Sequence, residues 1–196
     1  MRIALIRHGE SHHRDDSPVT KAQLSWWINI YNQSGVRETE IFPTDTIKAM
    51  TMSSFIVTSD LKRAIDSAAL LKPDSNRRSD SLFREAELPV PYFIPSWLKM
   101  RPALWLVLLR CLWLVGVTKG CESLREAETR AEKAAAKLIS YAEKEGSVVL
   151  VGHGVFNRLI AKQLRKKGWR GNKKTKTTHW SCTMYDNELN GDSVGP

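Results

Sequence analysis

Cysteine is scarce in this sequence, and its arrangement excludes two kinds of structure. Only Cys111, Cys121 and Cys182 are present, and no two of them have a C-x-x-C spacing. An odd number without that spacing is typical of free thiols in a reducing compartment, and not of a disulfide framework or a zinc site. We therefore expect free thiols and a cytoplasmic protein.

Long hydrophobic runs are also missing. Arg7, His8 and Glu10 interrupt the first apolar run at once, so the N-terminus does not have the pattern of a secretory leader. The longest apolar stretch, residues 102–117, holds fewer than the ~18 apolar residues of a spanning helix, and Arg110 divides it. We expect no transmembrane segment.

Acidic residues are few relative to basic ones. The chain has 30 Lys and Arg against 21 Asp and Glu, a formal net charge of +9 and a pI near 9.6. This charge favours an anionic partner, which could be a phosphorylated small molecule, a nucleic acid or an acidic membrane surface. With 196 residues, 42% hydrophobic and 26% charged, the composition is otherwise that of one ordinary globular domain, residues 1–196.

Strand-like and helix-like patterns alternate along the chain. Apolar runs of strand length lie at residues 2–7, 53–59 and 147–154, and a final strand is expected at residues 178–186. Helical patterns cover residues 21–33, a short stretch from Thr44, and residues 60–72, 122–146 and 156–169. A short polar strand or loop is expected around residues 82–88. The alternation predicts an α/β fold: a three-layer α/β/α sandwich around a mostly parallel central sheet.

Several helix ends carry recognisable capping residues. Thr20 is the expected N-cap of the first helix, and either Ser59 or Asp60 is the expected N-cap of the helix over residues 60–72. Gly146 is expected to end the long helix that is rich in Ala, Glu and Lys.

Charged and basic residues follow three of the predicted strands. Arg7 and His8 end the first strand, Ser59 to Arg63 follow the second, and His153 lies between two glycines after the third. If these strands are parallel neighbours, the three ends meet at one edge of the sheet, where α/β proteins usually bind ligands. Two arginines and two histidines beside a helix N-terminus would form a trap for a tetrahedral dianion.

Five sequence motifs in order resemble those of the histidine phosphatase superfamily, which contains cofactor-dependent phosphoglycerate mutases and many phosphatases. They are RHGES (7–11), TSDLKRAIDSA (58–68), LFREAEL (82–88), GCESL (120–124) and VVLVGHG (148–154). The resemblance runs from residue 2 to about residue 158 and is closest to the small bacterial-type phosphatases of the phosphoglycerate mutase-like branch.

The resemblance implies a role for each motif residue. His8 would be the nucleophile and become phosphohistidine, while Arg7, Arg63 and His153 would bind the phosphoryl oxygens. Glu85 would protonate the leaving oxygen and then activate water. The chemistry of the residues agrees, since imidazole attacks only when it is neutral and two guanidinium groups should lower its pKa further. A backbone carbonyl would be needed to fix the tautomer of His8.

Some site assignments stay open at this stage. Glu87 lies two residues after Glu85 and would share its face in an extended segment, so it is the alternative proton donor. Ser59 is a further candidate for binding substrate. Ser123 and Glu122 are interpreted as the start of a helix, without a catalytic role.

The first motif departs from the family pattern RHGES-x-W-N, because His13 and Arg14 replace Trp and Asn. Arg14 could bind a second anionic group of the substrate, or it could be a solvated loop residue. The departure, together with a chain shorter than a typical mutase, favours a phosphatase over a mutase.

The apolar segment 102–117 lies in a variable insertion at about residues 88–120. Three interpretations remain open for it: a core or homodimer-interface helix, a membrane-surface contact, or a lid over the active site. In the lid, Trp97, Trp105 or Trp113 would line a hydrophobic pocket for the leaving group.

Residues 165–180 form the most basic segment of the chain. A solvated surface is the first interpretation, and steering of phosphorylated substrates toward His8 is the second. Because Trp169 and Trp180 are interleaved with the charges, contact with single-stranded nucleic acid is a third, less favoured one.

The sequence therefore predicts a phosphatase that hydrolyses a phosphorylated small molecule, a phosphate monoester, through a phosphohistidine at His8, without metal or cofactor. A phosphoglycerate-type mutase is the alternative among enzymes. A non-catalytic protein that binds a phospholigand or nucleic acid is the alternative from another class.

Overall fold

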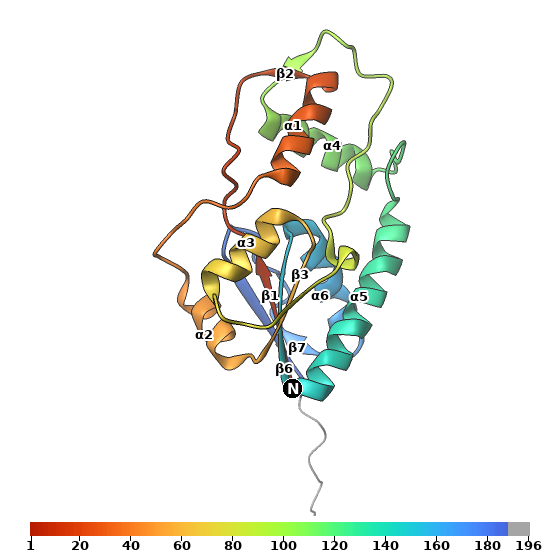
Figure 1. The fold of residues 1–196 in the computed structure, drawn as a ribbon. Helices are drawn as coiled ribbons and strands as arrows, with labels where there is room; N and C mark the ends of the chain where they lie inside the picture. The colour runs from red at the N-terminus through yellow and green to blue at the C-terminus, as the bar shows by residue number, and fades with distance from the viewer. Residues whose placement is uncertain (188–196) are drawn as a thin grey trace, which may run out of the picture.

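A six-stranded sheet forms the centre of the molecule in a computed structural model, which describes residues 1–187 (Figure 1). The strand order is β4-β3-β6-β1-β8-β7. The strands are β1 (Arg2–Arg7), β3 (Phe55–Thr58), β4 (Arg77–Ser79), β6 (Ser147–Gly152), β7 (Arg170–Gly171) and β8 (Cys182–Asp186). Neighbours among β4, β3, β6 and β1 pair in parallel, whereas β8 is antiparallel to both β1 and β7. The predicted mostly parallel sheet is thus confirmed, with an antiparallel edge that the sequence did not indicate.

Helices cover both faces of this sheet (Figure 1). One face carries α2 (Thr44–Met52) and α3 (Lys62–Leu71), and the other carries α5 (Leu124–Glu145) and α6 (Gly154–Lys166). Successive side chains of a strand point to opposite faces, so Ile3 and Leu5 pack under α5 and α6 while Ala4 and Ile6 pack under α2 and α3. The central strands are buried on both faces, which explains why they read as continuous apolar runs.

A smaller layer lies above the carboxyl ends of the parallel strands, and we call it the cap (Figure 1). It consists of helices α1 (Lys21–Gln33) and α4 (Pro102–Leu114), the two-stranded ribbon of β2 (Val19–Thr20) and β5 (Lys99–Met100), and the connecting segment 88–98. Leu24 and Trp27 of α1 pack against Trp105 and Leu109 of α4. The cap therefore has a core of its own.

Helix ends agree with the sequence in two places and differ in one. Thr20 caps α1 in a capping box with Gln23, and Gly146 ends α5 with a φ of 74°. The expected cap at Ser59 or Asp60 is wrong: α3 begins at Lys62, and its N-cap Leu61 makes no side-chain cap hydrogen bond. Asp60 is not free to cap the helix because its carboxylate accepts two hydrogen bonds from Arg84, each 2.7 Å long.

The polar segment around 82–88 holds no strand. A single turn of 3₁₀ helix covers Ser81–Phe83, and residues 84–98 have no regular helix or strand, while the strand of this region, β4, lies earlier. The expected domain 1–196 extends past the described residues, since 188–196 lie outside them.

Candidate active site

The ends of β1, β3 and β6 bring the predicted residues together. Arg7 is in register with Gly152 of β6, and Thr58 of β3 is in register with Val151. The backbone N–H of His8 donates to the carbonyl of Gly152 across 3.0 Å. Because the strands are parallel, the residues that follow each of them meet at one edge of the sheet, directly below the cap.

One ring nitrogen of His8 contacts a backbone carbonyl, and the other faces the guanidinium of Arg63. Its Nδ1 lies 2.7 Å from the carbonyl oxygen of Gly9, and its Nε2 lies 3.2 Å from Nε of Arg63. A carbonyl only accepts and a guanidinium only donates, so Nδ1 carries the proton and Nε2 carries the lone pair. The backbone carbonyl that a nucleophilic imidazole requires is therefore present.

Arg63 lies in the first turn of α3 and is held from two sides by α1. Its terminal nitrogen donates to Oδ1 of Asn32 across 2.9 Å, and its guanidinium carbon lies 4.6 Å from the centre of the Tyr31 ring. Burial lowers the pKa of Arg63, but from an ordinary value so high that the group stays charged. The cap thus fixes the direction in which this cation points.

Arg7 reaches the segment that precedes β8. Its guanidinium donates to the carbonyl of Thr177, while its Nε is buried without a hydrogen-bond partner among the described residues. A buried donor without a partner costs free energy unless a ligand satisfies it. Arg7 therefore has donor capacity left for an anion.

His153 is the N-cap residue of α6 and lies beside His8, with 5.0 Å between the ring centres. Both of its ring nitrogens are buried without a partner among residues 1–187. Burial and the nearby charges of Arg63 and Arg7 hold the pKa of His153 well below its ordinary value of 6.5. Burial, followed by His153 and Arg63, lowers the pKa of His8 in the same way. Both rings are neutral at pH 7.

Glu85 is anchored on the amino end of α6. Its carboxylate accepts from the backbone N–H groups of Val155 at 3.1 Å and Phe156 at 2.8 Å. Carboxylates are stabilised at helix N-termini by these free donors and by the helix dipole. Glu87, by contrast, is exposed, although both carboxylates border the same cavity.

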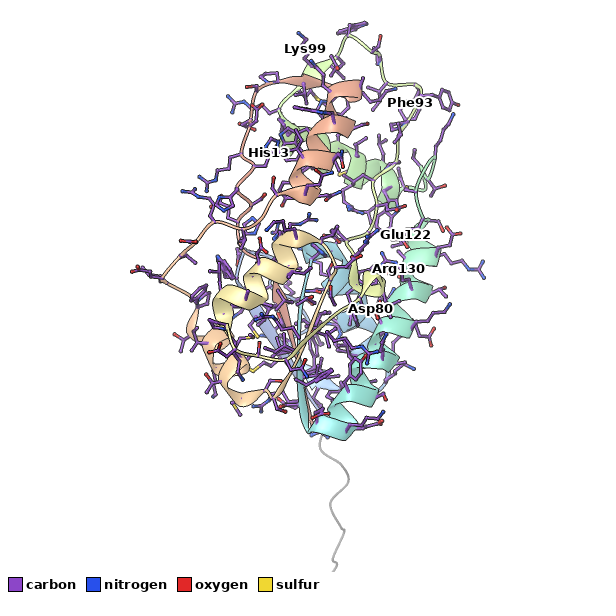
Figure 2. All side chains as sticks on the ribbon, viewed as in Figure 1. His13, Asp80, Phe93, Lys99, Glu122 and Arg130 are labelled. Carbon is purple, nitrogen blue, oxygen red and sulfur yellow. The ribbon has the colours of Figure 1, made fainter. Side chains whose placement is uncertain are left out.

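A cavity of about 1040 Å³ lies between the sheet edge and the cap. Its floor holds Arg7, His8, Arg63, Glu85 and His153. Its upper walls are apolar and are formed by residues of α1, of the segment 88–98 and of α4: Trp27, Ile28, Tyr31, Leu88, Val90, Leu106 and Val107. Figure 2 shows Glu122 and Arg130 of its rim at the upper end of α5, below the cap.

The segment 102–117 forms α4, and one side of this helix borders the cavity, as the lid interpretation requires. Its tryptophans do not line the cavity. Trp105 and Trp113 are buried on the inner face of α4, and their indole N–H groups donate to the carbonyls of Val19 and Glu122. Trp97 is exposed and does not border the cavity. The expected tryptophan lining is therefore wrong, because positions 106, 107, 110 and 111 of the helix face the cavity instead.

The comparisons with known proteins agree with this geometry. The family model of the histidine phosphatase superfamily (branch 1) matches residues 3–192. The chain belongs to the histidine phosphatase superfamily. None of the curated proteins matches the sequence significantly.

Solved structures show that the fold is that of the histidine phosphatases. The product of an open reading frame of Mycobacterium tuberculosis is 17% identical with a TM-score of 0.59, over 96% of this chain and 92% of that one. A mycobacterial glucosyl-3-phosphoglycerate phosphatase is 22% identical with a TM-score of 0.55, over 84% and 79%. A phosphoserine phosphatase of Entamoeba histolytica, solved with 3-phosphoglyceric acid, is 15% identical with a TM-score of 0.55, over 93% and 89%.

Two candidate residues of this histidine phosphatase lie away from the cavity. Arg14 is exposed and forms an ion pair with Glu10, and Ser59 is buried, where its hydroxyl accepts from the N–H of Leu61 at 3.3 Å. Neither borders the cavity. The sequence pattern placed both near strand ends but could not show where their side chains point.

The basic segment 165–180 contacts the site through the backbone of Thr177 and the side chain of His179. Thr177 accepts from Arg7, and Nδ1 of His179 lies 3.1 Å from the carbonyl of His8. Trp169 and Trp180 are buried, so neither ring is exposed for stacking on a nucleic-acid base.

Three residues at the site were not predicted from the sequence: Tyr31, Asn32 and His179. Tyr31 and Asn32 come from the cap, for which no motif existed. His179 could have been found, because a final antiparallel strand begins at the edge where the parallel strands end. Within residues 1–187, no group of three or more His, Cys, Asp or Glu side chains is arranged to hold a metal ion.

Proposed function

We propose that the protein is a phosphatase that hydrolyses phosphate monoesters through a phosphohistidine at His8. The observation that carries the proposal is the assigned tautomer of His8: Nδ1–H bonds to Gly9, and the lone pair of Nε2 faces the guanidinium of Arg63. A phosphoryl group that enters between Nε2 and Arg63 would meet a nucleophile and a cation aligned with each other.

Each step uses a residue of the cavity floor. Nε2 attacks phosphorus, and the bond from phosphorus to the ester oxygen breaks while Glu85, as the acid, gives a proton to that oxygen. Arg7, Arg63 and a donor nitrogen of His153 stabilise the charge on the phosphoryl oxygens. Water then attacks phosphorus, its proton passes to Glu85, the P–N bond breaks and phosphate leaves with His8 neutral again.

Glu85 is favoured over Glu87 as the proton donor by its position. The Glu85 carboxylate is anchored on α6 one turn from His153, whereas the Glu87 side chain is exposed. A group that gives and takes a proton at the ester oxygen must stay at a fixed place, and the anchored Glu85 side chain meets that requirement.

The cavity favours an apolar, uncharged leaving group. Of its outer cations, Arg84 is paired with Asp60 and Arg130 with Glu122. Arg110 donates to the carbonyls of Ala86 and Glu87 and stacks on Trp113. The upper walls are mostly apolar and provide surface for alkyl or aryl groups, and these three arginines are already engaged by other groups of the protein.

Hydrolysis of 4-nitrophenyl phosphate in the presence of EDTA tests the proposal. We expect turnover that EDTA does not reduce, that is lost in His8→Ala, and that is kept in the matched control His12→Ala, since His12 is exposed. Transfer of phosphoryl groups between positions of a phosphoglycerate, with little phosphate released, would identify a mutase instead. Phosphate binding without turnover or phosphoenzyme would identify a non-catalytic binding protein.

A further inference from the structure

Helix α4 exposes an apolar face to solvent along its whole length. Its outward positions carry no polar or charged side chain: Ala103, Leu104, Val107, Cys111, Leu114 and Val115. At 100° per residue they fall within about 120° of the helix circumference, opposite the buried tryptophans. We call these six residues the α4 face. The large ones are more than half exposed, from 56% for Leu114 to 78% for Val115.

An exposed apolar face of this kind requires an explanation. A helix on the surface of a globular protein normally presents polar residues to water, and contiguous exposed apolar surface marks a contact with another molecule or a membrane. The buried side of α4 already supplies the core of the cap, so the outer face is not needed for folding.

Aromatic side chains lie beside the end of this helix. The N–H of Val90 donates to the carbonyl of Lys119 across 2.9 Å, and the Lys119 ammonium lies 4.8 Å from the ring centre of Tyr92. These contacts hold Tyr92 and its neighbour Phe93 next to the turn that follows α4, and both rings are exposed. Figure 2 shows Phe93 pointing outward at the edge of the cap. Exposed rings with a nearby cation are typical of membrane–water interfaces.

The segment that carries the α4 face is basic. Residues 88–121 contain no Asp or Glu, but they contain Lys99, Arg101, Arg110 and Lys119. Arg101 stands at the N-cap of α4, where the helix dipole disfavours a cation, and Lys119 follows the opposite end. Arg101 forms an ion pair with Asp16 at 3.7 Å, but both side chains are exposed and such a pair is weak, so the guanidinium stays accessible to an anionic surface, as does Lys119 at the other end.

We propose that the α4 face docks the protein on the surface of an anionic lipid bilayer. At 13 residues α4 is about 20 Å long, too short to cross a bilayer but long enough to lie in its interface. No helix within residues 1–187 is long and apolar enough to span a membrane. Arg101 and Lys119 would meet lipid phosphates while Leu104, Leu114 and Val115 enter the acyl boundary.

A second copy of the chain fits this face less well. In a two-fold dimer the same patch contacts itself, so Arg101 and Lys119 would meet their own counterparts. Asp16 offsets the charge of Arg101 in each copy, but residues 88–121 supply no carboxylate that could offset Lys119. Docking would also place the cavity at the lipid surface, because Val107 and Cys111 belong to both the α4 face and the cavity wall.

Vesicle sedimentation of the full chain tests the proposal. We expect binding to vesicles of phosphatidylcholine mixed with phosphatidylglycerol, weak binding to phosphatidylcholine alone, and a decrease at high salt. Leu104→Glu and Leu114→Glu should each lower binding roughly tenfold, because each removes buried apolar area and adds a like charge. Ile41→Glu is the matched control, since Ile41 is 85% exposed but lies outside the cap.

Vesicle binding and phosphatase activity are measured separately, so failure of one proposal can be told from failure of the other. Binding requires no turnover, so His8→Ala should sediment with vesicles like the intact chain, and Leu104→Glu should still hydrolyse a soluble aryl phosphate. Equal binding by Leu104→Glu, Leu114→Glu and Ile41→Glu would overturn the proposal. So would an absence of vesicle binding together with a dimer that Leu104→Glu dissociates, which would assign the face to a second copy.

Discussion

Nε of Arg63 donates to Nε2 of His8 across 3.2 Å. The contact joins the residue that follows β1 to the first turn of α3, the helix that comes after β3. It aligns the atom that would attack phosphorus with a cation that would bind the transferred group. Binding and transfer of a phosphoryl group would both depend on this pair and on the residues that hold it in place.

The pH dependence of turnover should reflect a neutral His8. Burial, with His153 and Arg63, lowers the pKa of His8 below 6.5, so the imidazole stays unprotonated in mildly acidic solution. When kcat/KM is measured from pH 4 to 9, the midpoint of its decrease on the acid side should therefore lie well below pH 6.5. A limb at 6.5 or higher would contradict the assigned environment of His8.

The same shift has a consequence for stability. A histidine whose pKa is lower in the folded state binds protons more readily when unfolded, so stability is lost as the pH falls below about 6.5. Burial lowers the pKa of both His8 and His153, so their effects add in the same direction. Thermal unfolding should show a midpoint that decreases from pH 7 toward pH 5.

Replacement of Glu85 should affect poor leaving groups most. Glu85→Gln cannot give a proton, so hydrolysis of an alkyl phosphate should slow by about 10²- to 10⁴-fold. The loss should be smaller for the phosphorylation step of 4-nitrophenyl phosphate, whose leaving group needs no proton. Glu87→Gln is the matched control. If Glu87→Gln shows the leaving-group dependence and Glu85→Gln does not, the two roles are reversed.

Asn32 should act as a positioning residue for Arg63. Asn32→Ala removes the 2.9 Å hydrogen bond to the guanidinium, so Arg63 should bind the phosphoryl group less well and kcat/KM should fall about tenfold. Inhibition by inorganic phosphate should weaken in parallel, a change that general loss of stability would not produce. Asn29→Ala, on the same helix and bonded only to Gln33 in the described contacts, should leave both values unchanged.

Gly9 should not tolerate a side chain. A Cβ there would lie 2.0 Å from the ring of Trp180 and 2.4 Å from Val36, contacts that no side chain can make without displacing its neighbours. Gly9→Ala should lower the free energy of unfolding by about 1–3 kcal/mol, measured by urea denaturation. Gly154→Ala serves as control, because its nearest contact would be 3.6 Å and Ala favours the helix. Equal losses for the two variants would show that the close approach at Gly9 is not decisive.

The sequence predicted the sheet edge and its catalytic candidates because their positions follow from local patterns. Apolar runs that end in Arg7, His8 and His153 identify buried parallel strands, and such strands end at a common edge. His8 and Arg63 therefore converge as expected, one after a strand and one in the first turn of a helix. Glu85 lies in the irregular segment 84–98, and only the family resemblance pointed to it.

The cap could not be predicted in the same way. Its packing depends on side chains far apart in the chain, such as Trp27 against Leu109, and helical spacing alone does not tell which face of α4 meets α1. This is why the two tryptophans of α4 were expected in the cavity. Trp105 is instead buried in the core of the cap, and Trp113 is buried against Ala86 and Ala127. The contact between Asn32 and Arg63 depends on the same packing.

Trapping of the phosphoenzyme shows whether His8 is the nucleophile. Enzyme mixed with an aryl phosphate and quenched within one turnover should carry one phosphoryl group, labile to acid and stable to base, on the peptide that contains His8. Intact protein should show it, His8→Ala should not, and Glu85→Gln should accumulate more of it because its hydrolysis is slowed. Turnover with phosphate on another residue, or turnover that persists in His8→Ala without any phosphoenzyme, would rule out His8 as the nucleophile.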